Sequence, residues 1–240
     1  MPVPEASDAR APAHSRGRRA ISPVKIAAWW AHDYVYAAIW QVRAFFDRTP
    51  PSALLSGDGV PIVALPGIYE TWKFLQPLSE AVHRRGHPVH VLDALGRSRR
   101  PITDMADRVA AHLVAHDLTD VVLLAHSRGG LVGKQVMTGP ASDRVRGMVA
   151  VATPFAGSWY ARLMLSRSLR SLSPRDATIV ALGAHATANA RIVSIYGLFD
   201  PHIPSGSELL GAKNILLDTG GHFRILAHPR VIAEVVAFAT

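Results

Sequence analysis

Three side chains that together can activate a nucleophile stand in loops that each follow a short apolar run. They are Ser127, Asp200 and His222, and the runs before them span residues 121–124, 192–196 and 214–218. A serine hydroxyl reacts poorly unless a histidine within hydrogen-bond reach takes its proton and a carboxylate orients that histidine. If the apolar runs are parallel strands, their carboxyl ends meet at one edge of a sheet and bring the three side chains together. We therefore expect a nucleophile–acid–base triad.

The segment around Ser127 has the pattern of a strand that turns directly into a helix. Residues 121–124 are too few for a helix and apolar enough for a strand that is buried on both faces. Residues 129–137 then fit a helix. Between them, Ala125-His-Ser-Arg-Gly129 is a small-x-Ser-x-Gly turn, which lifts the serine oxygen above the sheet and places it at a helix N-terminus. Because other parallel-sheet proteins contain similar turns, the assignment of Ser127 as the nucleophile depends also on the acid and the base that accompany it.

Two aspartates compete for the role of the acid. Asp200 follows the serine and precedes His222, whereas Asp93 lies in an earlier loop and suits a loop-capping role. We therefore expect Asp200 to be the acid and His222, in a Gly-Gly-His loop, to be the base. Three other histidines are less suitable as the base. His202 lies only two residues beyond the acid, and His228 stands at the start of the last helix. His126 precedes the nucleophile and is expected to point to the core or the oxyanion loop.

A second loop is expected to supply one of two hydrogen-bond donors for negative charge on a substrate oxygen. Residues 61–65 fit a buried strand that runs into Pro66-Gly67-Ile68-Tyr69. We expect the backbone N–H groups of Arg128 and Ile68 to form the oxyanion hole, with the N–H of Tyr69 as the alternative second donor. The residues expected to line the substrate pocket are aromatic and lie in the loops around the site: Tyr69, Phe155 and Phe199.

The chain resembles the α/β-hydrolases, and within them the small bacterial triacylglycerol lipases and esterases. The resemblance covers residues 60–240 and rests on Ala125-His-Ser-Arg-Gly-Gly130, Thr153-Pro-Phe-Ala-Gly-Ser158, Gly197-Leu-Phe-Asp200 and Gly221-His222. It implies an α/β-hydrolase fold: a mostly parallel sheet with helices on both faces and a small lid. It also implies hydrolysis of carboxylic esters without cofactor or metal, through an acyl-enzyme on Ser127. Acyltransferases and thioesterases use the same triad, and a ligand-binding protein can keep the fold without the chemistry.

The region before this domain consists of a basic arm (residues 1–20), which its composition predicts to be disordered, and an aromatic helix (residues 21–48). One side of the helix combines aromatic rings with cations, which suits a lipid–water interface: Trp29, Tyr36, Trp40, Lys25 and Arg43. The other side is apolar: Tyr34, Val35, Ala38, Val42, Phe45 and Phe46. Peripheral membrane contact through residues 22–47 and docking on the domain are both open. If the helix meets lipid, we expect the catalytic domain to hydrolyse soluble esters without it.

Length and composition suit one α/β domain with a large core, since the chain has 240 residues, 49% of them hydrophobic. The absence of cysteine excludes disulfides, thiol catalysis and cysteine-ligated zinc. A net charge of +8 permits attraction to anionic surfaces, but no nucleic-acid motif is present, so we expect a small-molecule or lipid ester as partner and no nucleic acid. The aromatic helix is too short and interrupted to span a bilayer, and no clear cleavage site follows it, so a cytoplasmic location is expected.

Overall fold

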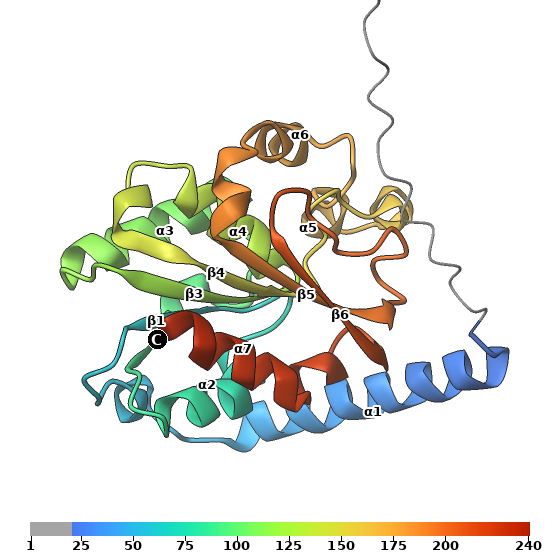
Figure 1. Cartoon of the computed structure of the whole chain (residues 1–240). Helices are drawn as coiled ribbons and strands as arrows, with labels where there is room; N and C mark the ends of the chain where they lie inside the picture. Colours follow the sequence, from blue (N-terminus) through green and yellow to red (C-terminus); the bar gives the residue numbers. More distant parts are fainter. Residues whose placement is uncertain (1–20) are drawn as a thin grey trace, which may run out of the picture.

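The centre of the structure is a six-stranded sheet in which every strand is parallel to its neighbours (Figure 1). The computed structural model describes residues 21–240, so the disorder expected for residues 1–20 lies outside the described residues. The strand order is β2-β1-β3-β4-β5-β6. The strands are β1 (Ile62–Leu65), β2 (Val89–Val91), β3 (Val121–His126), β4 (Val145–Val151), β5 (Ile192–Phe199) and β6 (Lys213–Gly220). The parallel sheet expected from the sequence is confirmed.

Helices cover both faces of the sheet (Figure 1). One layer contains α3, α4 and α6, which pack on strand residues such as Leu123 and Met148; the other contains α1, α2 and α7, which pack on residues such as Leu124 and Val149. Successive residues of one strand therefore serve opposite layers. The α-helices are α1 (Pro23–Phe46), α2 (Gln76–His83), α3 (Ile102–Ala115), α4 (Arg128–Met137), α5 (Arg167–Arg170), α6 (Ala177–Ala184) and α7 (Pro229–Ala239). The 3-10 helices are η1 (Pro51–Leu54), η2 (Trp72–Leu75), η3 (Asp93–Leu95), η4 (Ser142–Arg144), η5 (Trp159–Leu163), η6 (Thr187–Arg191) and η7 (Arg224–Ala227).

The neighbouring strands β1 and β3 are buried along their whole length, as the apolar sequence predicted. They pair in register from Ile62 opposite Val122 to Leu65 opposite Ala125. The strand β3 continues two residues beyond the predicted run and ends at His126, directly before the nucleophile. Because the strands are parallel, the loops that follow them lie at one edge of the sheet.

The aromatic helix is α1, and it runs along the edge of the molecule beside α2 and α7 (Figure 1). Trp29 is 8% exposed, Asp33 is fully buried, and Tyr36 and Trp40 pack against the core. Of the two arrangements that the sequence left open for this side of the helix, the structure shows docking on the domain and not exposure to lipid. The opposite side carries an unbroken row of exposed apolar residues, called the α1 stripe below: Val24, Ala28, Ala31, Val35, Ile39, Val42 and Phe46.

Two helical regions are divided into short pieces. Pro77 lies in the first turn of α2, which follows the separate helix η2. The cap segment, residues 159–190, contains four short helices: η5, α5, α6 and η6. The segment remains small, and α6 begins where the side chain of Asp176 accepts a backbone N–H.

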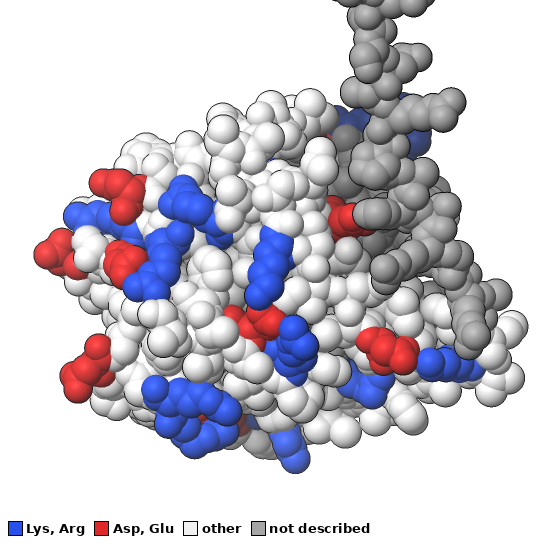
Figure 2. Space-filling model, viewed as in Figure 1, with Lys and Arg blue, Asp and Glu red and all other residues white. Residues whose placement is uncertain are grey.

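Basic and acidic side chains are interleaved on the face drawn in Figure 2. Across the described residues, several charged side chains form pairs, such as Arg146 with Asp120 at 2.5 Å and Lys213 with Glu234 at 2.6 Å. This face therefore presents no large surface of one sign. Within residues 21–240, none of the helices has the length and apolar character needed to cross a bilayer.

Candidate active site

The turn between β3 and α4 holds Ser127 in a conformation that few residues other than glycine adopt. Its φ is +52° and its ψ is −124°, and its N–H donates to the carbonyl oxygen of Val151 at 2.8 Å. The small residues around it are a steric requirement, because a Cβ added to Gly129 would lie 2.1 Å from the carbonyl oxygen of Leu65. Backbone strain of this kind persists where the surrounding structure enforces it, often at functional sites. The turn therefore has the shape that the sequence predicted.

The structure brings the three predicted residues into one hydrogen-bonded row. Ser127 Oγ lies 2.9 Å from His222 Nε2, and His222 Nδ1 lies 2.8 Å from Asp200 Oδ2. The second carboxylate oxygen of Asp200 accepts the backbone N–H groups of His202 at 2.7 Å and Ile203 at 3.0 Å, which fixes its orientation. In this arrangement the imidazole can take a proton from the serine while the carboxylate stabilises the resulting cation.

The pKa values of His222 and Asp200 are shifted in the directions expected for a histidine base paired with a carboxylate. Burial alone would lower the pKa of His222, but the charge and hydrogen bond of Asp200, together with the charges of Glu70 and Asp33, outweigh burial and raise the pKa above the ordinary value of 6.5. Burial would likewise raise the pKa of Asp200, but the charge of His222 and the hydrogen bonds to the carboxylate lower it. Asp200 therefore remains ionised at neutral pH and keeps a hydrogen on Nδ1 of the imidazole.

The other candidates for acid and base lie elsewhere. Asp93 is exposed at the start of η3 and accepts the indole N–H of Trp72 at 3.0 Å. His228 caps α7 through the N–H of Arg230. His202 is close to His222, with ring centroids 4.7 Å apart, but its Nε2 contacts the hydroxyl of Tyr34 at 3.1 Å. Burial and the neighbouring His222 lower the pKa of His202 to about 4, so it is neutral at neutral pH.

The loop after β1 narrows the choice of oxyanion donors. Tyr69 has φ +64°, and its N–H donates to the carbonyl oxygen of Arg97 at 2.8 Å, so that N–H is not available to a substrate. The N–H of Gly67 donates to Glu70 Oε2 at 2.7 Å. These contacts favour the N–H of Ile68 as the second donor. Arg128 is the first residue of α4, where backbone N–H groups have no partner within the helix.

The aromatic residues predicted to line the pocket have different surroundings. Tyr69 is half-buried, and its hydroxyl donates to Ser166 Oγ at 2.6 Å, which joins the loop after β1 to the cap segment. Phe155 is buried in the core on the α4 side of the sheet. Phe199 is half-buried at the end of β5, directly before Asp200. Their contact with substrate stays a prediction.

A family model described as the alpha/beta hydrolase family matches residues 62–208. The chain belongs to this family. The match includes Ser127 and Asp200 and ends before His222, and α1 lies outside it. The resemblance inferred from the motifs is confirmed at the level of the family and its fold.

Solved structures agree with this assignment. A Bacillus licheniformis lipase in its mature form has a TM-score of 0.59 at 16% identity, over 80% of this chain and 100% of the lipase. A monoacylglycerol lipase from Paleococcus ferrophilus has a TM-score of 0.55 at 15% identity, over 74% and 94%. A bromoperoxidase from Bacillus anthracis has a TM-score of 0.53 at 15% identity, over 76% and 92%. These likenesses show the fold, and no curated protein matches this chain in sequence.

Sequence reasoning missed a buried acid beside the site, Glu70. Its carboxylate lies 2.9 Å from His126 Nδ1, and His126 Nε2 lies 3.0 Å from the carbonyl oxygen of His222. The expectation that His126 points to the core or the oxyanion loop is confirmed, because Glu70 belongs to the loop after β1. A sequence signal existed, since Glu70 stands among apolar and aromatic residues directly after a buried strand.

The side chain of Arg128 has a structural role that the sequence did not reveal. It is 1% exposed, and its Nη1 donates to the carbonyl oxygen of Ser98 at 2.6 Å, while Nη2 donates to that of Arg100. Burial lowers its pKa to about 10. The guanidinium therefore ties the turn at Ser127 to the loop after β2, and its backbone N–H remains the group considered for the oxyanion hole.

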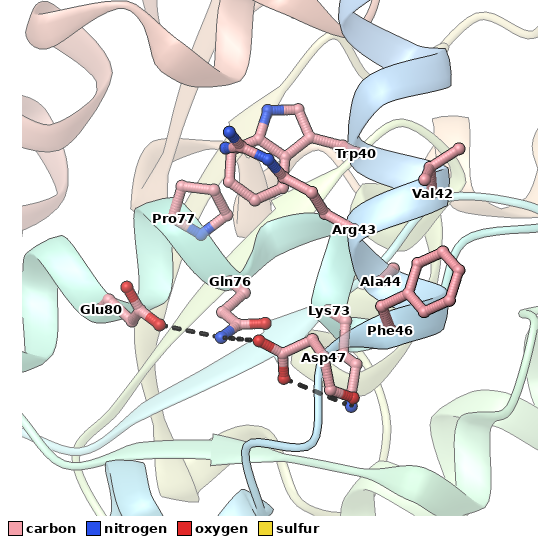
Figure 3. Close-up of a pocket in the computed structure, with 10 residues that line it drawn as sticks. All are labelled: Trp40, Val42, Arg43, Ala44, Phe46, Asp47, Lys73, Gln76, Pro77 and Glu80. Atoms are coloured by element: carbon pink, nitrogen blue, oxygen red, sulfur yellow. Dashed lines mark hydrogen bonds and ion pairs between the residues drawn. The ribbon is translucent and has the colours of Figure 1, made fainter.

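A hollow of about 530 Å³ lies between the end of α1 and the start of α2 (Figure 3). It is lined by none of the residues of the Ser127–His222–Asp200 row. Its polar side chains bond to one another: Lys73 pairs with Asp47 at 3.4 Å, and Gln76 Nε2 donates to Asp47 at 3.1 Å and to Glu80 at 2.8 Å. These contacts join the end of α1 to α2, so we interpret the hollow as part of helix docking.

Proposed function

We propose that this protein is a serine hydrolase of carboxylic esters. The observation that carries the proposal is the continuous row of contacts from Ser127 Oγ through His222 to Asp200, with distances of 2.9 and 2.8 Å. Each residue of the row follows a different strand of the sheet, β3, β5 or β6, so a rigid scaffold positions it. Structural neighbours named as lipases and esterases support an ester as the substrate.

In the first half of the proposed reaction, Ser127 Oγ attacks the ester carbonyl carbon and His222 Nε2 accepts the hydroxyl proton. Asp200 stabilises the imidazolium that forms, and the N–H groups of Arg128 and Ile68 bind the oxyanion. When the tetrahedral intermediate collapses, the C–O bond to the alcohol breaks and His222 returns the proton to the departing oxygen. The products of this half are the free alcohol and an acyl group on Ser127.

In the second half, water attacks the acyl-serine, and the same groups act again. His222 removes a proton from water, the oxyanion forms in the same donors, and the carboxylic acid leaves as Ser127 recovers its hydrogen. No cofactor or metal enters either half. An acyltransferase would replace water by an alcohol at this point, so the competition between water and added alcohols distinguishes the two activities.

An apolar acyl chain is the substrate part that the surroundings of the site favour. The cap segment is joined to the loop after β1 by the Tyr69–Ser166 hydrogen bond of 2.6 Å. Directly before this contact it exposes three apolar side chains, Leu163, Met164 and Leu165, to between 40% and 96%. Exposed apolar groups of this kind often mark a surface that binds an apolar ligand. We therefore propose esters with a hydrocarbon acyl group, including lipid esters.

The experiment that tests the function is active-site labelling with a fluorescent alkyl phosphonate, together with hydrolysis of p-nitrophenyl butyrate. The proposal predicts labelling of the full-length protein and none of Ser127→Ala, with ester hydrolysis reduced at least ~10³-fold in the folded variant. Equal turnover by Ser127→Ala would remove Ser127 from the mechanism. A protein that neither reacts with the phosphonate nor hydrolyses esters would instead support a ligand-binding role.

We also propose that α1 contacts an anionic lipid surface through the α1 stripe. The stripe is continuous over a helix of 24 residues, and Val35, Val42 and Phe46 are 57–69% exposed. The twenty residues before the helix contain four arginines and only two acids, Glu5 and Asp8, so the chain joins positive charge to the apolar row. Because the inner side of α1 contacts the loop of His222, such a contact would place the active site near lipid.

A further inference from the structure

The inner side of α1 carries the only acidic side chain between residues 21 and 46, that of Asp33. This carboxylate is fully buried. Its Oδ2 accepts the backbone N–H of His222 at 2.8 Å, and its Oδ1 accepts the N–H groups of Phe223 and Arg224, each at 2.8 Å. One carboxylate therefore satisfies three consecutive backbone donors of the loop that carries His222.

We propose that Asp33 is a positioning residue for His222, and that α1 is thereby part of the catalytic unit. The carboxylate fixes the backbone from which the imidazole reaches Ser127. This inference rests on the proposed role of His222 as the base. It concerns a helix outside residues 62–208, the part matched by the family model. It also replaces the expectation that the catalytic domain works without this helix.

Two glycines allow α1 to approach the loop this closely. A Cβ on Gly220 would lie 2.3 Å from the ring of Trp29, and a Cβ on Gly221 would lie 2.4 Å from Asp33 Oδ1. Gly221 also has φ +113°, a conformation that other residues rarely adopt. Trp29 and Asp33 are four residues apart, so they lie on the same face of the helix and contact the two glycines together.

A buried carboxylate is well suited to this task. Hydrogen bonds to a charged acceptor are shorter and stronger than those between neutral groups, and burial of the charge is tolerated when donors surround it. The carbonyl oxygen of His222 is held from the other side by His126 at 3.0 Å. Both polar groups of the His222 backbone are thus bonded to side chains that come from outside its own loop.

The charge of Asp33 also bears on the basicity of His222. The titratable groups near the imidazole ring of His222 come from four elements, which are α1, the loop after β1, β3 and the loop after β5. These groups are Asp33, Glu70, His126, Asp200 and His202. Burial opposes the protonated form of His222, Asp200 makes the largest favourable contribution, and Glu70 and Asp33 add smaller ones, so that the pKa is raised. Removing the charge of Asp33 should therefore lower the pKa of His222.

The test compares the full-length protein with Asp33→Asn, which keeps the shape but removes the charge and directs an amide N–H at one of the three donors. We expect kcat for p-nitrophenyl butyrate to fall by about tenfold or more, because the substitution misplaces His222 for proton transfer. We expect little change in KM, because substrate binding does not depend on the position of the base. We expect the acidic limb of the pH profile to move to lower pH. Amide hydrogen exchange at residues 222–224 should become faster.

The matched control is Trp40→Ala, which removes packing from α1 about 10 Å further along the helix. It should lower the melting temperature without moving the acidic limb or the exchange of residues 222–224. The proposal is overturned if folded Asp33→Asn keeps the wild-type kcat, acidic limb and exchange rates, or if Trp40→Ala reproduces all three changes.

Hydrogen exchange separates this inference from the proposed function. If the wild-type protein hydrolyses no ester, the function fails, while slow exchange of the amides of residues 222–224 in the wild type and fast exchange in Asp33→Asn would still support the contact. If Asp33→Asn does not fold, hydrogen exchange of the wild-type protein tests the proposal by itself. Slow exchange of these three amides supports the proposal, and exchange as fast as in an exposed loop overturns it.

Discussion

The Nε2 atom of His126 lies 3.0 Å from the backbone carbonyl oxygen of His222, so the residue before the nucleophile is bonded to the residue that we propose as base. A carbonyl oxygen only accepts, and Nε2 therefore carries a hydrogen. The other nitrogen, Nδ1, faces Glu70 at 2.9 Å. Either His126 is an imidazolium beside a carboxylate, or it is neutral and accepts a hydrogen from a protonated Glu70. Both arrangements share one proton and carry no net charge.

Because Glu70 and His126 share one proton, two substitutions of Glu70 should have different effects. Glu70→Gln can accept the N–H of Gly67 through its oxygen and donate to His126 through its amide, so we expect a folded protein with kcat/KM within about fivefold of wild type. Glu70→Ala leaves two buried groups without a partner, at a cost of roughly 1–3 kcal/mol each, and should lower both melting temperature and kcat/KM by more than Gln does. Equal losses in both variants would contradict a shared proton.

The two aspartates that compete in the sequence can be separated by their asparagine variants. Asp200→Asn leaves the imidazole in the wrong tautomer and should lower kcat on the order of 10⁴-fold. Asp93→Asn keeps an acceptor for the indole N–H of Trp72 and should retain kcat close to the wild-type value. Steady-state kinetics with p-nitrophenyl butyrate measures both. A large loss in Asp93→Asn with activity retained in Asp200→Asn would move the acid to the loop after β2.

The pH dependence follows from the raised pKa of His222. The base acts only when neutral, and Asp200 makes the largest of the contributions that together outweigh burial and set its pKa above 6.5. The value of kcat/KM should therefore fall as the pH decreases through a point above 6.5. Asp200→Asn removes the carboxylate charge, so the residual activity of that variant should show an acidic limb at lower pH. Initial rates from about pH 5 to about pH 9 test this, and a limb that does not move would exclude Asp200 as the source of the shift.

The triad arrangement was predictable because its signals are local. Ser127 is marked by small neighbours that the tight turn requires, and Asp200 and His222 stand directly after apolar runs in the chain order of the family. Asp33 gives no such signal, since it binds backbone N–H groups about 190 positions away, which any sequence supplies. The only indication was a lone acid within an aromatic, apolar helix.

The sequence left the orientation of α1 open for a different physical reason. Aromatic rings beside cations suit a lipid interface, but they suit docking equally well when the rings pack inward and the cations cover them. Lys25 Nζ lies 4.6 Å from the ring of Trp29, and the guanidinium of Arg43 lies 4.9 Å from that of Trp40. Because both arrangements produce the same helical pattern, only the packing of Trp29 and Asp33 against the glycines of the His222 loop distinguishes them.

The α1 stripe gives a direct test of membrane contact. In the double variant Val35→Gln and Phe46→Gln, two exposed apolar side chains are lost at little expense to folding. If these side chains enter lipid, the double variant loses about 3 kcal/mol of binding free energy. Binding to vesicles that contain phosphatidylserine should then weaken by roughly 100-fold. Hydrolysis of p-nitrophenyl butyrate should be unchanged, because both residues are exposed on the side of α1 opposite the buried Asp33. Co-sedimentation with vesicles at low and high salt measures the effect.

The matched control for this prediction is Val114→Gln, which removes a similarly exposed apolar residue from α3, in the opposite helix layer. It should leave vesicle binding unchanged. Binding of the wild-type protein should weaken as salt screens the arginines before α1 and should be weaker to uncharged vesicles. If the wild-type protein ignores vesicles at low salt while the double variant changes the oligomeric state in solution, a second copy of the chain covers the stripe and the lipid proposal is wrong.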